Sequence, residues 1–168
     1  MRDRVTVDLP ASGQALSMLG MPFAARATFG SNLVGNEALE VGRFFRDPAK
    51  CAMVIVTTAD HLAMTETLDI HRQLETLAIA TAGVIFNRTA GSQFDESAIA
   101  AMLATETGGA ALGELASIAH SELNRRQRER RALGILRRNL GVPILPLLEE
   151  RSGPTLDVAT RLAAQLAI

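Results

Sequence analysis

The segment AMVIVTTADHLAMTETLDIHRQLETLAIATAGVIFN, residues 52–87, decides the fold class. Its ends, residues 52–58 and 82–87, are continuous apolar runs of strand length, which are typical of strands buried on both faces of a parallel sheet. Between them, apolar residues recur at helical spacing, namely Met64, Leu68, Leu74 and Leu77. This order predicts a βαβ unit with a right-handed crossover.

Other segments extend the same α/β pattern. Residues 142–148 form a third apolar run, and Val5 and Val7 alternate with polar neighbours as in a fourth strand. Residues 94–140 have a helical pattern with a break at 107–109, and a last helix is expected from Pro154 to Ala167. The apolar positions expected to face inward on that helix are Leu156, Ala159, Leu162, Ala163 and Leu166. We expect a single domain, residues 1–168, with a mostly parallel sheet flanked by helices.

The region of residues 15–50 fits this pattern least well. Glycines and Pro22 divide it into short apolar pieces, which predicts broken helices or a mobile helical insert. Its methionine-bearing part, residues 16–29, either packs in the core or a dimer contact, or binds a protein client.

Composition excludes several classes of protein. The formal charge of −1 and the absence of Trp and Tyr argue against nucleic-acid binding. Cys51 is the only cysteine, which excludes an internal disulfide and a multi-cysteine zinc site. No stretch reaches the ~18 apolar residues of a membrane span, and the N-terminus lacks a signal-peptide core. We therefore expect a cytoplasmic protein without direct membrane insertion.

Asp8 is the first candidate for chemistry. The stretch VTVDLPASG, residues 5–13, ends an alternating segment in a carboxylate and continues into turn-forming residues. Such a carboxylate can present a metal or water ligand at the carboxyl edge of a nucleotide-binding sheet. It can equally serve as a local hydrogen-bond acceptor in a turn.

The sequence contains no complete motif for gripping phosphate groups. The pattern G-x-x-x-x-G-K-[ST] is absent, and the only lysine, Lys50, follows no glycine-rich loop. The G-x-S-x-G and H-E-x-x-H motifs are absent as well.

Four blocks nevertheless resemble one family in order and spacing. They are residues 3–19, 54–79, 82–88 and 142–166, and together they are similar to the C-terminal part of the arsenical-pump and tail-anchored-protein-targeting (ArsA-type) ATPases, which are deviant P-loop NTPases. The resemblance implies ATP and Mg²⁺ as ligands. Because the phosphate-binding loop has no counterpart here, we expect both ligands to bind only together with a P-loop-bearing half, and the isolated chain to be inactive.

The resemblance also implies site residues. Asp8 matches the family's catalytic aspartate near the Mg²⁺ water shell, and Ser12, Gly13 and Gln14 match its nucleotide-sensing switch. Gln14 replaces the usual histidine and cannot take up a proton near neutral pH.

Residues on the adenine side are implied in the same way. Asn87 matches an asparagine that hydrogen-bonds the adenine edge, and Pro146 and Leu147 match a pair that lines the base pocket. From the residues alone, Asn87 could be a turn residue and the Pro146-Leu147 pair could be plain core packing.

Two functions stay open at this point. In the first, the chain is half of an ATPase whose partner is a P-loop-bearing half or a second copy of itself in a homo-oligomer. In the second, it is a non-enzymatic protein-interaction module on a degenerate NTPase fold, which uses residues 16–45 or the arginine-dense residues 125–138. An arginine-dense helix is also typical of a simple solvated face.

Overall fold

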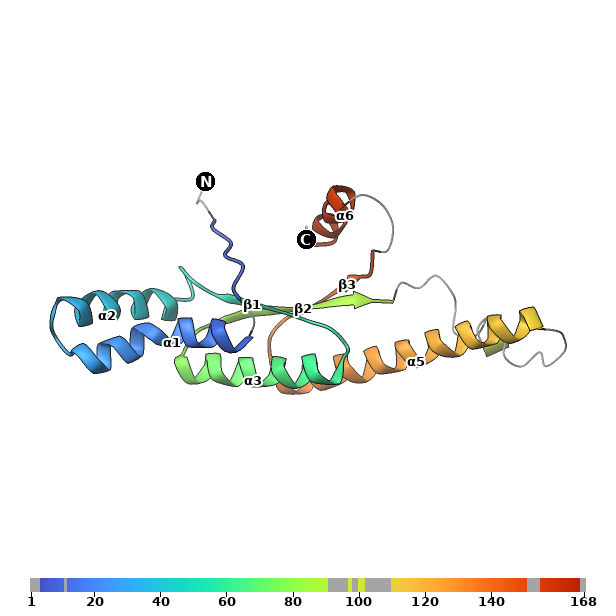
Figure 1. The fold of residues 1–168 in the computed structure, drawn as a ribbon, viewed down its shortest axis with the longest axis horizontal. Helices are drawn as coiled ribbons and strands as arrows, with labels where there is room; N and C mark the ends of the chain where they lie inside the picture. The colour runs from blue at the N-terminus through green and yellow to red at the C-terminus, as the bar shows by residue number, and fades with distance from the viewer. Residues whose placement is uncertain are drawn as a thin grey trace. The chain divides into compact units, whose positions relative to one another are not determined.

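The computed structural model of the chain describes residues 4–10, 12–90, 97, 100, 101, 110–150 and 155–166. The βαβ unit predicted from residues 52–87 is present: β1 (Met53–Thr57) is followed by α3 (His61–Leu77) and β2 (Thr81–Thr89). With β3 (Ile144–Leu148), these strands form a parallel sheet in the order β1-β2-β3, flanked by helices (Figure 1). The prediction of an α/β fold is confirmed, as are the three apolar strands.

The chain divides into two compact units, and each is described by itself. The first comprises Met1–Ile55 and Thr65–Gly83, and the second comprises Val56–Met64 and Val84–Ile168.

A helical hairpin is the main feature of the first unit. Helices α1 (Ser12–Phe29) and α2 (Leu33–Arg46) pack against each other (Figure 1). Helix α2 begins at Asn32, whose side chain accepts a hydrogen bond from the Gly35 N–H at 2.9 Å. Instead of broken helical pieces, residues 12–46 thus form two regular helices, and α1 continues through Pro22.

Two glycines of α2 permit the close packing of this hairpin. A Cβ atom on Gly35 would lie 2.0 Å from the Gly30 carbonyl oxygen, and one on Gly42 would lie 2.9 Å from the Phe23 ring. The Arg46 guanidinium lies over that ring, 4.1 Å from its centre, and its Nε donates to the Leu77 carbonyl at 2.7 Å. These contacts hold the end of α2 to the end of α3.

The core of the second unit is formed by buried residues of β2, β3 and the long helix that precedes β3. The register of β2 and β3 pairs Val84 with Ile144 and Phe86 with Pro146. Phe86 and Leu136 are fully buried, and Leu136 belongs to the long helix α5 (Ala110–Asn139). The predicted long helix is therefore present, whereas the predicted break at 107–109 lies outside the described residues.

The last helix, α6 (Thr155–Leu166), is held to β3 by polar contacts. The Gln165 side chain accepts from the Leu148 N–H at 2.8 Å, and Arg161 donates to Glu150 at 2.9 Å. No described residue of α6 is buried, and Leu156 is 77% exposed. The prediction of an inward apolar face on this helix is wrong, because of the expected inward positions only Leu162 is half-buried and the others are exposed, and the contacts described above are polar. The predicted ends at Pro154 and Ala167 lie outside the described residues.

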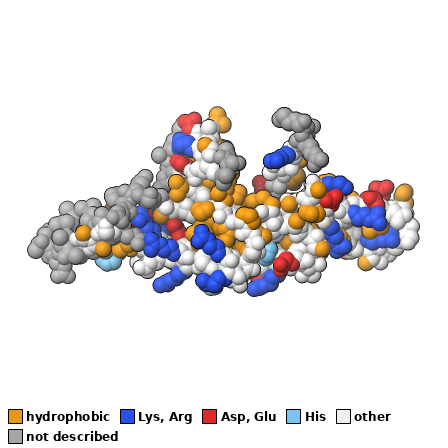
Figure 2. Space-filling view, turned by 180° about the vertical axis from the view of Figure 1, so that it is seen from behind, with side chains coloured by type: hydrophobic (Ala, Val, Ile, Leu, Met, Phe, Trp, Pro, Cys, Tyr) orange, Lys and Arg blue, Asp and Glu red, His pale blue; other side chains and the backbone are white. Residues whose placement is uncertain are grey.

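Two further strand predictions are wrong. Residues 4–10 form no strand, because their backbone pairs with no described strand, and Val5 is 86% exposed. Burial on both strand faces is also wrong for β1, where Ile55 and Thr57 are buried but Val54 and Val56 are 55% and 61% exposed. Figure 2 shows apolar side chains open to solvent on the face it presents.

The hairpin packing predicts opposite effects for two glycine substitutions. Gly35→Ala should destabilise the protein by about 2 kcal/mol because its methyl group would overlap backbone atoms. Gly20→Ala, in the interior of α1 with no atom within 4 Å of the new Cβ, should stabilise it by up to about 1 kcal/mol. Urea unfolding followed by circular dichroism measures both changes, and equal stability of the two variants would contradict the packing described.

Candidate functional site

A bulge near the carboxyl end of β2 is the most irregular feature of the sheet. Phe86 pairs with Pro146 and Thr89 pairs with Leu148, so three steps along β2 match two along β3. Arg88, inside the bulge, has a φ of 58°, a conformation that is strained for a residue other than glycine. Bulges are common beside functional sites, where they redirect a side chain.

Asn87 lies in this bulge and is half-buried. Its Oδ1 accepts a hydrogen bond from the Arg88 N–H at 2.8 Å, which supports the strained backbone. Its amide nitrogen donates to none of the described residues. The side chain therefore retains two donor hydrogens and one acceptor lone pair for another molecule.

The predicted base-pocket pair lies on the neighbouring strand. Pro146 is exposed and pairs with Phe86, one residue before Asn87. Leu147 is buried in the core, and its carbonyl accepts from the Thr89 hydroxyl at 3.0 Å. The structure thus brings Asn87 and Pro146 to adjacent positions of the sheet, while the Leu147 side chain packs inside.

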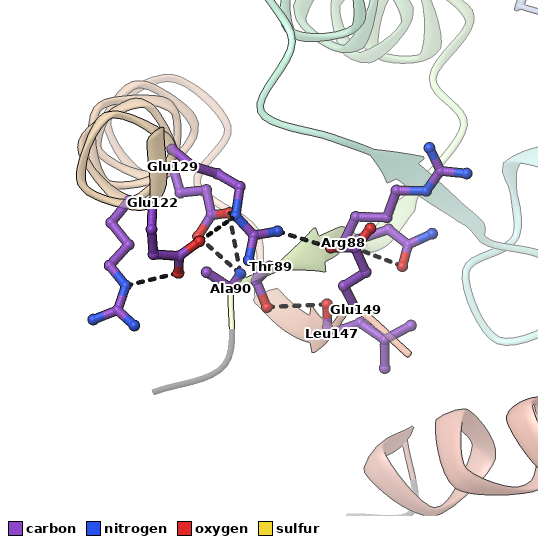
Figure 3. Close-up of polar contacts among 10 residues, drawn as sticks. Arg88, Thr89, Ala90, Glu122, Glu129, Leu147 and Glu149 are labelled. Carbon is purple, nitrogen blue, oxygen red and sulfur yellow. Dashed lines mark hydrogen bonds and ion pairs between the residues drawn. The ribbon is translucent and has the colours of Figure 1, made fainter. Parts of the chain in front are cut away.

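Charged side chains of α5 hold the ends of both strands. We call Glu122, Arg125, Arg126 and Glu129 the α5 charge cluster. Both carboxylate oxygens of Glu129 accept from the Ala90 N–H at 3.1 Å, just after β2 (Figure 3). Arg125 Nη1 donates to Glu149 at 2.8 Å, just after β3. One face of a single helix thus anchors the chain where it leaves each strand.

Within the α5 charge cluster, Glu122 receives hydrogen bonds from two arginines. Arg125 Nε donates to it at 3.1 Å and Arg126 Nε at 3.0 Å (Figure 3). Burial acts to raise the pKa of Glu122, but the hydrogen bonds from Arg126 and Arg125 outweigh it and hold the pKa below its ordinary value. For Arg125, burial acts to lower the pKa, and the contact with Glu122 and the charge of Glu129 reverse the direction and raise it.

The arginine-dense segment is therefore only partly a solvated face. Arg125 and Arg126 are half-buried in ion pairs, whereas Arg128, Arg131 and Arg138 are exposed. In the α5 charge cluster, each glutamate stands three or four positions from each arginine, in the order Glu122, Arg125, Arg126, Glu129. This spacing places them on one helix face, and it is the sequence signal that could have identified the cluster.

The predicted switch residues belong to the first unit. Asp8 lies exposed in the irregular segment of residues 4–10 and contacts no described residue through a hydrogen bond or ion pair. Ser12 opens α1, and Gly13 and Gln14 follow it, both exposed. Gly13, Leu16 and Gly20 of α1 line an open hollow of about 340 Å³ together with Gln73, Thr76 and Leu77 of α3.

Lys50 and Cys51 are not among the residues at the ends of β2 and β3. Lys50 Nζ lies 3.2 Å from Asp47, and hydrogen bonds from the Ala49 N–H and from Lys50 lower the pKa of that aspartate. Partial burial raises the pKa of the Cys51 thiol, which makes it a poor nucleophile. In the part of the chain that the structure describes, no three His, Cys, Asp or Glu side chains are grouped to hold a metal ion.

The described helices are also unsuited to crossing a bilayer, since none is both long and apolar enough. No protein-family model matches the chain, and no curated protein is significantly similar to it.

The ion pairs of Glu122 predict an acid-dependent loss of stability. Because its folded-state pKa lies below the ordinary value of 4.5, the stabilisation is present above pH 4.5 and is lost as the pH falls through the folded-state pKa. Glu122→Gln should lower the free energy of unfolding at pH 7 by about 1 kcal/mol and flatten its pH dependence. Urea unfolding between pH 7 and pH 3 measures both, and a Gln variant with the wild-type pH slope would contradict the assignment. Glu66→Gln, on an exposed position of α3, is the control.

Proposed function

We propose that this chain supplies the base-binding part of a nucleotide-binding ATPase of the ArsA type, and that the phosphate-binding loop lies on other polypeptide. The observation that carries the proposal is the bulge at Asn87 and Arg88, near the carboxyl end of a parallel strand. Ligands of open α/β sheets bind outside this end of the strands. The order and spacing of the sequence blocks that resemble the ATPases support the nucleotide as the ligand.

Asn87 has the chemistry that an adenine edge requires. Adenine offers an amino donor beside a ring-nitrogen acceptor, and a side-chain amide offers an acceptor beside a donor. The remaining lone pair of Oδ1 and the hydrogens of Nδ2 meet both needs without breaking the hydrogen bond to the Arg88 N–H. The resemblance adds Pro146 as an apolar residue of the base pocket; it is exposed on the neighbouring strand and pairs with Phe86, the residue before Asn87.

The resemblance assigns Asp8 a role near the Mg²⁺ water shell, and it assigns Ser12, Gly13 and Gln14 the role of a nucleotide-sensing switch. An exposed carboxylate that makes no hydrogen bond or ion pair with the described residues fits one outer-sphere ligand of Mg²⁺, which prefers oxygen and retains several waters. When bound, Mg²⁺ would neutralise phosphate charge during transfer of the phosphoryl group to water. No three His, Cys, Asp or Glu side chains are grouped among the described residues, and in this proposal the nucleotide, water or the partner would supply the remaining ligands.

The partner proposed is a P-loop-bearing half or, through self-association, a second copy of the chain. Strands β1 and β3 are both edges of the three-stranded sheet, and an open edge pairs readily with a further strand. Val54 and Val56 on β1 are exposed as well. Strand addition beside β1 would satisfy its backbone groups, and a covering element would bury its two valines.

The second candidate is a non-enzymatic interaction module, and the surface of the α1–α2 hairpin favours it. Its apolar side chains are exposed at Met18, Met21, Phe29, Leu33, Val34, Val41 and Phe44. Methionine-bearing surfaces suit binding to proteins of varied shape. The only lysine, Lys50, is paired with Asp47 and lies in no glycine-rich loop, as expected for a module without phosphate binding.

Titration of ¹⁵N-labelled chain with adenosine tests the base-binding proposal without the partner. We expect weak binding with a Kd of about 1 mM, corresponding to about 4 kcal/mol, and shifts of the Asn87 side-chain amide and the Leu147 backbone amide. Asn87→Asp keeps an acceptor for the Arg88 N–H but lacks the amide donor, and Asn87→Ala lacks both. Both variants should bind adenosine about tenfold more weakly.

Wild-type affinity in both Asn87 variants would overturn the assignment and favour the interaction module. Mg-ATP titration gives the second readout, because the isolated chain should bind it no better than it binds adenosine. A low-micromolar Kd for Mg-ATP with the isolated chain would show that phosphate binding resides in this polypeptide after all.

A further inference from the structure

The loops that leave β2 and β3 are both attached to one side of α5. Glu129 accepts the Ala90 N–H with both oxygens at 3.1 Å, and Arg125 donates to Glu149 at 2.8 Å. The two strand ends are also joined directly, because the Glu149 N–H donates to the Thr89 carbonyl at 3.0 Å. Figure 3 shows these groups directed toward one another beside the bulge.

Both attachments lie just after the residues proposed to contact the base, on the C-terminal side of each strand. Ala90 is two residues after Arg88, and Glu149 is three residues after Pro146. On the other side, Phe86 is fully buried and holds β2 in the core. The strained bulge thus lies between a buried aromatic ring and a backbone N–H that a carboxylate holds, and strain of this kind persists only where its surroundings enforce it.

Because Glu129 is buried, loss of its hydrogen-bond partner would be energetically costly. The residue is 8% exposed, and a buried carboxylate without hydrogen-bond partners carries a large desolvation penalty. The Ala90 N–H supplies one, and Arg125 Nε supplies a charge 4.0 Å away. Removal of the carboxylate would leave the Ala90 N–H unsatisfied and the Arg125 charge with fewer counter-ions.

We propose that Glu129 and Arg125 are positioning residues, which hold the β2 bulge and the end of β3 so that the Asn87 amide and the Pro146 ring face a bound purine. This inference rests on the proposed function. Neither residue touches the base in this arrangement. Each acts through the backbone or carboxylate that it holds.

Three variants test the inference in the full chain. Glu129→Ala removes the acceptor, and Glu129→Gln keeps one acceptor oxygen without the charge. Arg131→Gly lowers helix propensity at an exposed position of the same helix without touching the α5 charge cluster, and so serves as the stability-matched control. The readouts are amide hydrogen exchange at Ala90, the chemical shift of the Asn87 side-chain amide without nucleoside, and the Kd for adenosine.

For Glu129→Ala we expect exchange at Ala90 to accelerate about tenfold or more, the Asn87 amide resonance to move, and adenosine to bind about tenfold more weakly. Glu129→Gln should give smaller changes in the same directions. Arg131→Gly should lower Tm and leave the Asn87 resonance and the Kd unchanged. If Glu129 served only overall stability, Glu129→Ala and Arg131→Gly would give the same result.

An unmoved Asn87 resonance in the folded Glu129→Ala variant would overturn the inference, as would equal shifts in Arg131→Gly. If Glu129→Ala does not fold, Glu129→Gln decides by the same criteria. Failure of wild-type protein to bind adenosine would refute the proposed function, whereas the Asn87 resonance without nucleoside still reports on positioning.

Discussion

The contact between the Glu129 carboxylate and the Ala90 N–H is the constraint on which the geometry of the sheet edge depends. It fixes the backbone immediately after a bulge that contains a non-glycine residue with positive φ. Apolar packing alone does not specify the backbone conformation of such a bulge, since the hydrophobic effect is non-directional. A directed, charge-assisted hydrogen bond does specify it. The polar contacts of α5 therefore determine where Asn87 lies.

The two kinds of surface in this protein have different physical origins. At the carboxyl ends of β2 and β3, charged groups are paired and partly buried, which gives a defined local structure. On β1 and on the α1–α2 hairpin, apolar side chains remain open to solvent. Exposed apolar groups of this kind are expected where another chain or segment binds. The proposed base-binding edge and the exposed apolar surfaces together suit a protein that works as part of a larger assembly.

The apolar pattern of residues 52–87 was sufficient to predict β1, α3 and β2, because strand and helix periods differ and each run has the length of one element. The alternating pattern at Val5 and Val7 wrongly predicted a strand, since alternation produces a strand only where a neighbouring strand accepts its backbone hydrogen bonds. The last helix was predicted correctly, but its expected inward apolar face was not, because polar contacts join α6 to the end of β3. The bulge at Asn87 and Arg88 carries no glycine and is invisible in the sequence. The spacing of Glu122, Arg125 and Glu129 is visible, but the arginine-dense residues 125–138 fitted either a partner surface or a solvated face.

The central claim is that the Asn87 side-chain amide contacts a purine base. The most direct measurement is a nuclear Overhauser experiment on ¹⁵N-labelled chain saturated with adenosine, which detects protons within about 5 Å of each other. The account predicts cross-peaks between the adenine ring protons and the Asn87 Nδ2 protons, together with contacts to the Pro146 ring. Adenosine that binds with contacts elsewhere, for example to the hollow lined by Gly13 and Leu77, would contradict it.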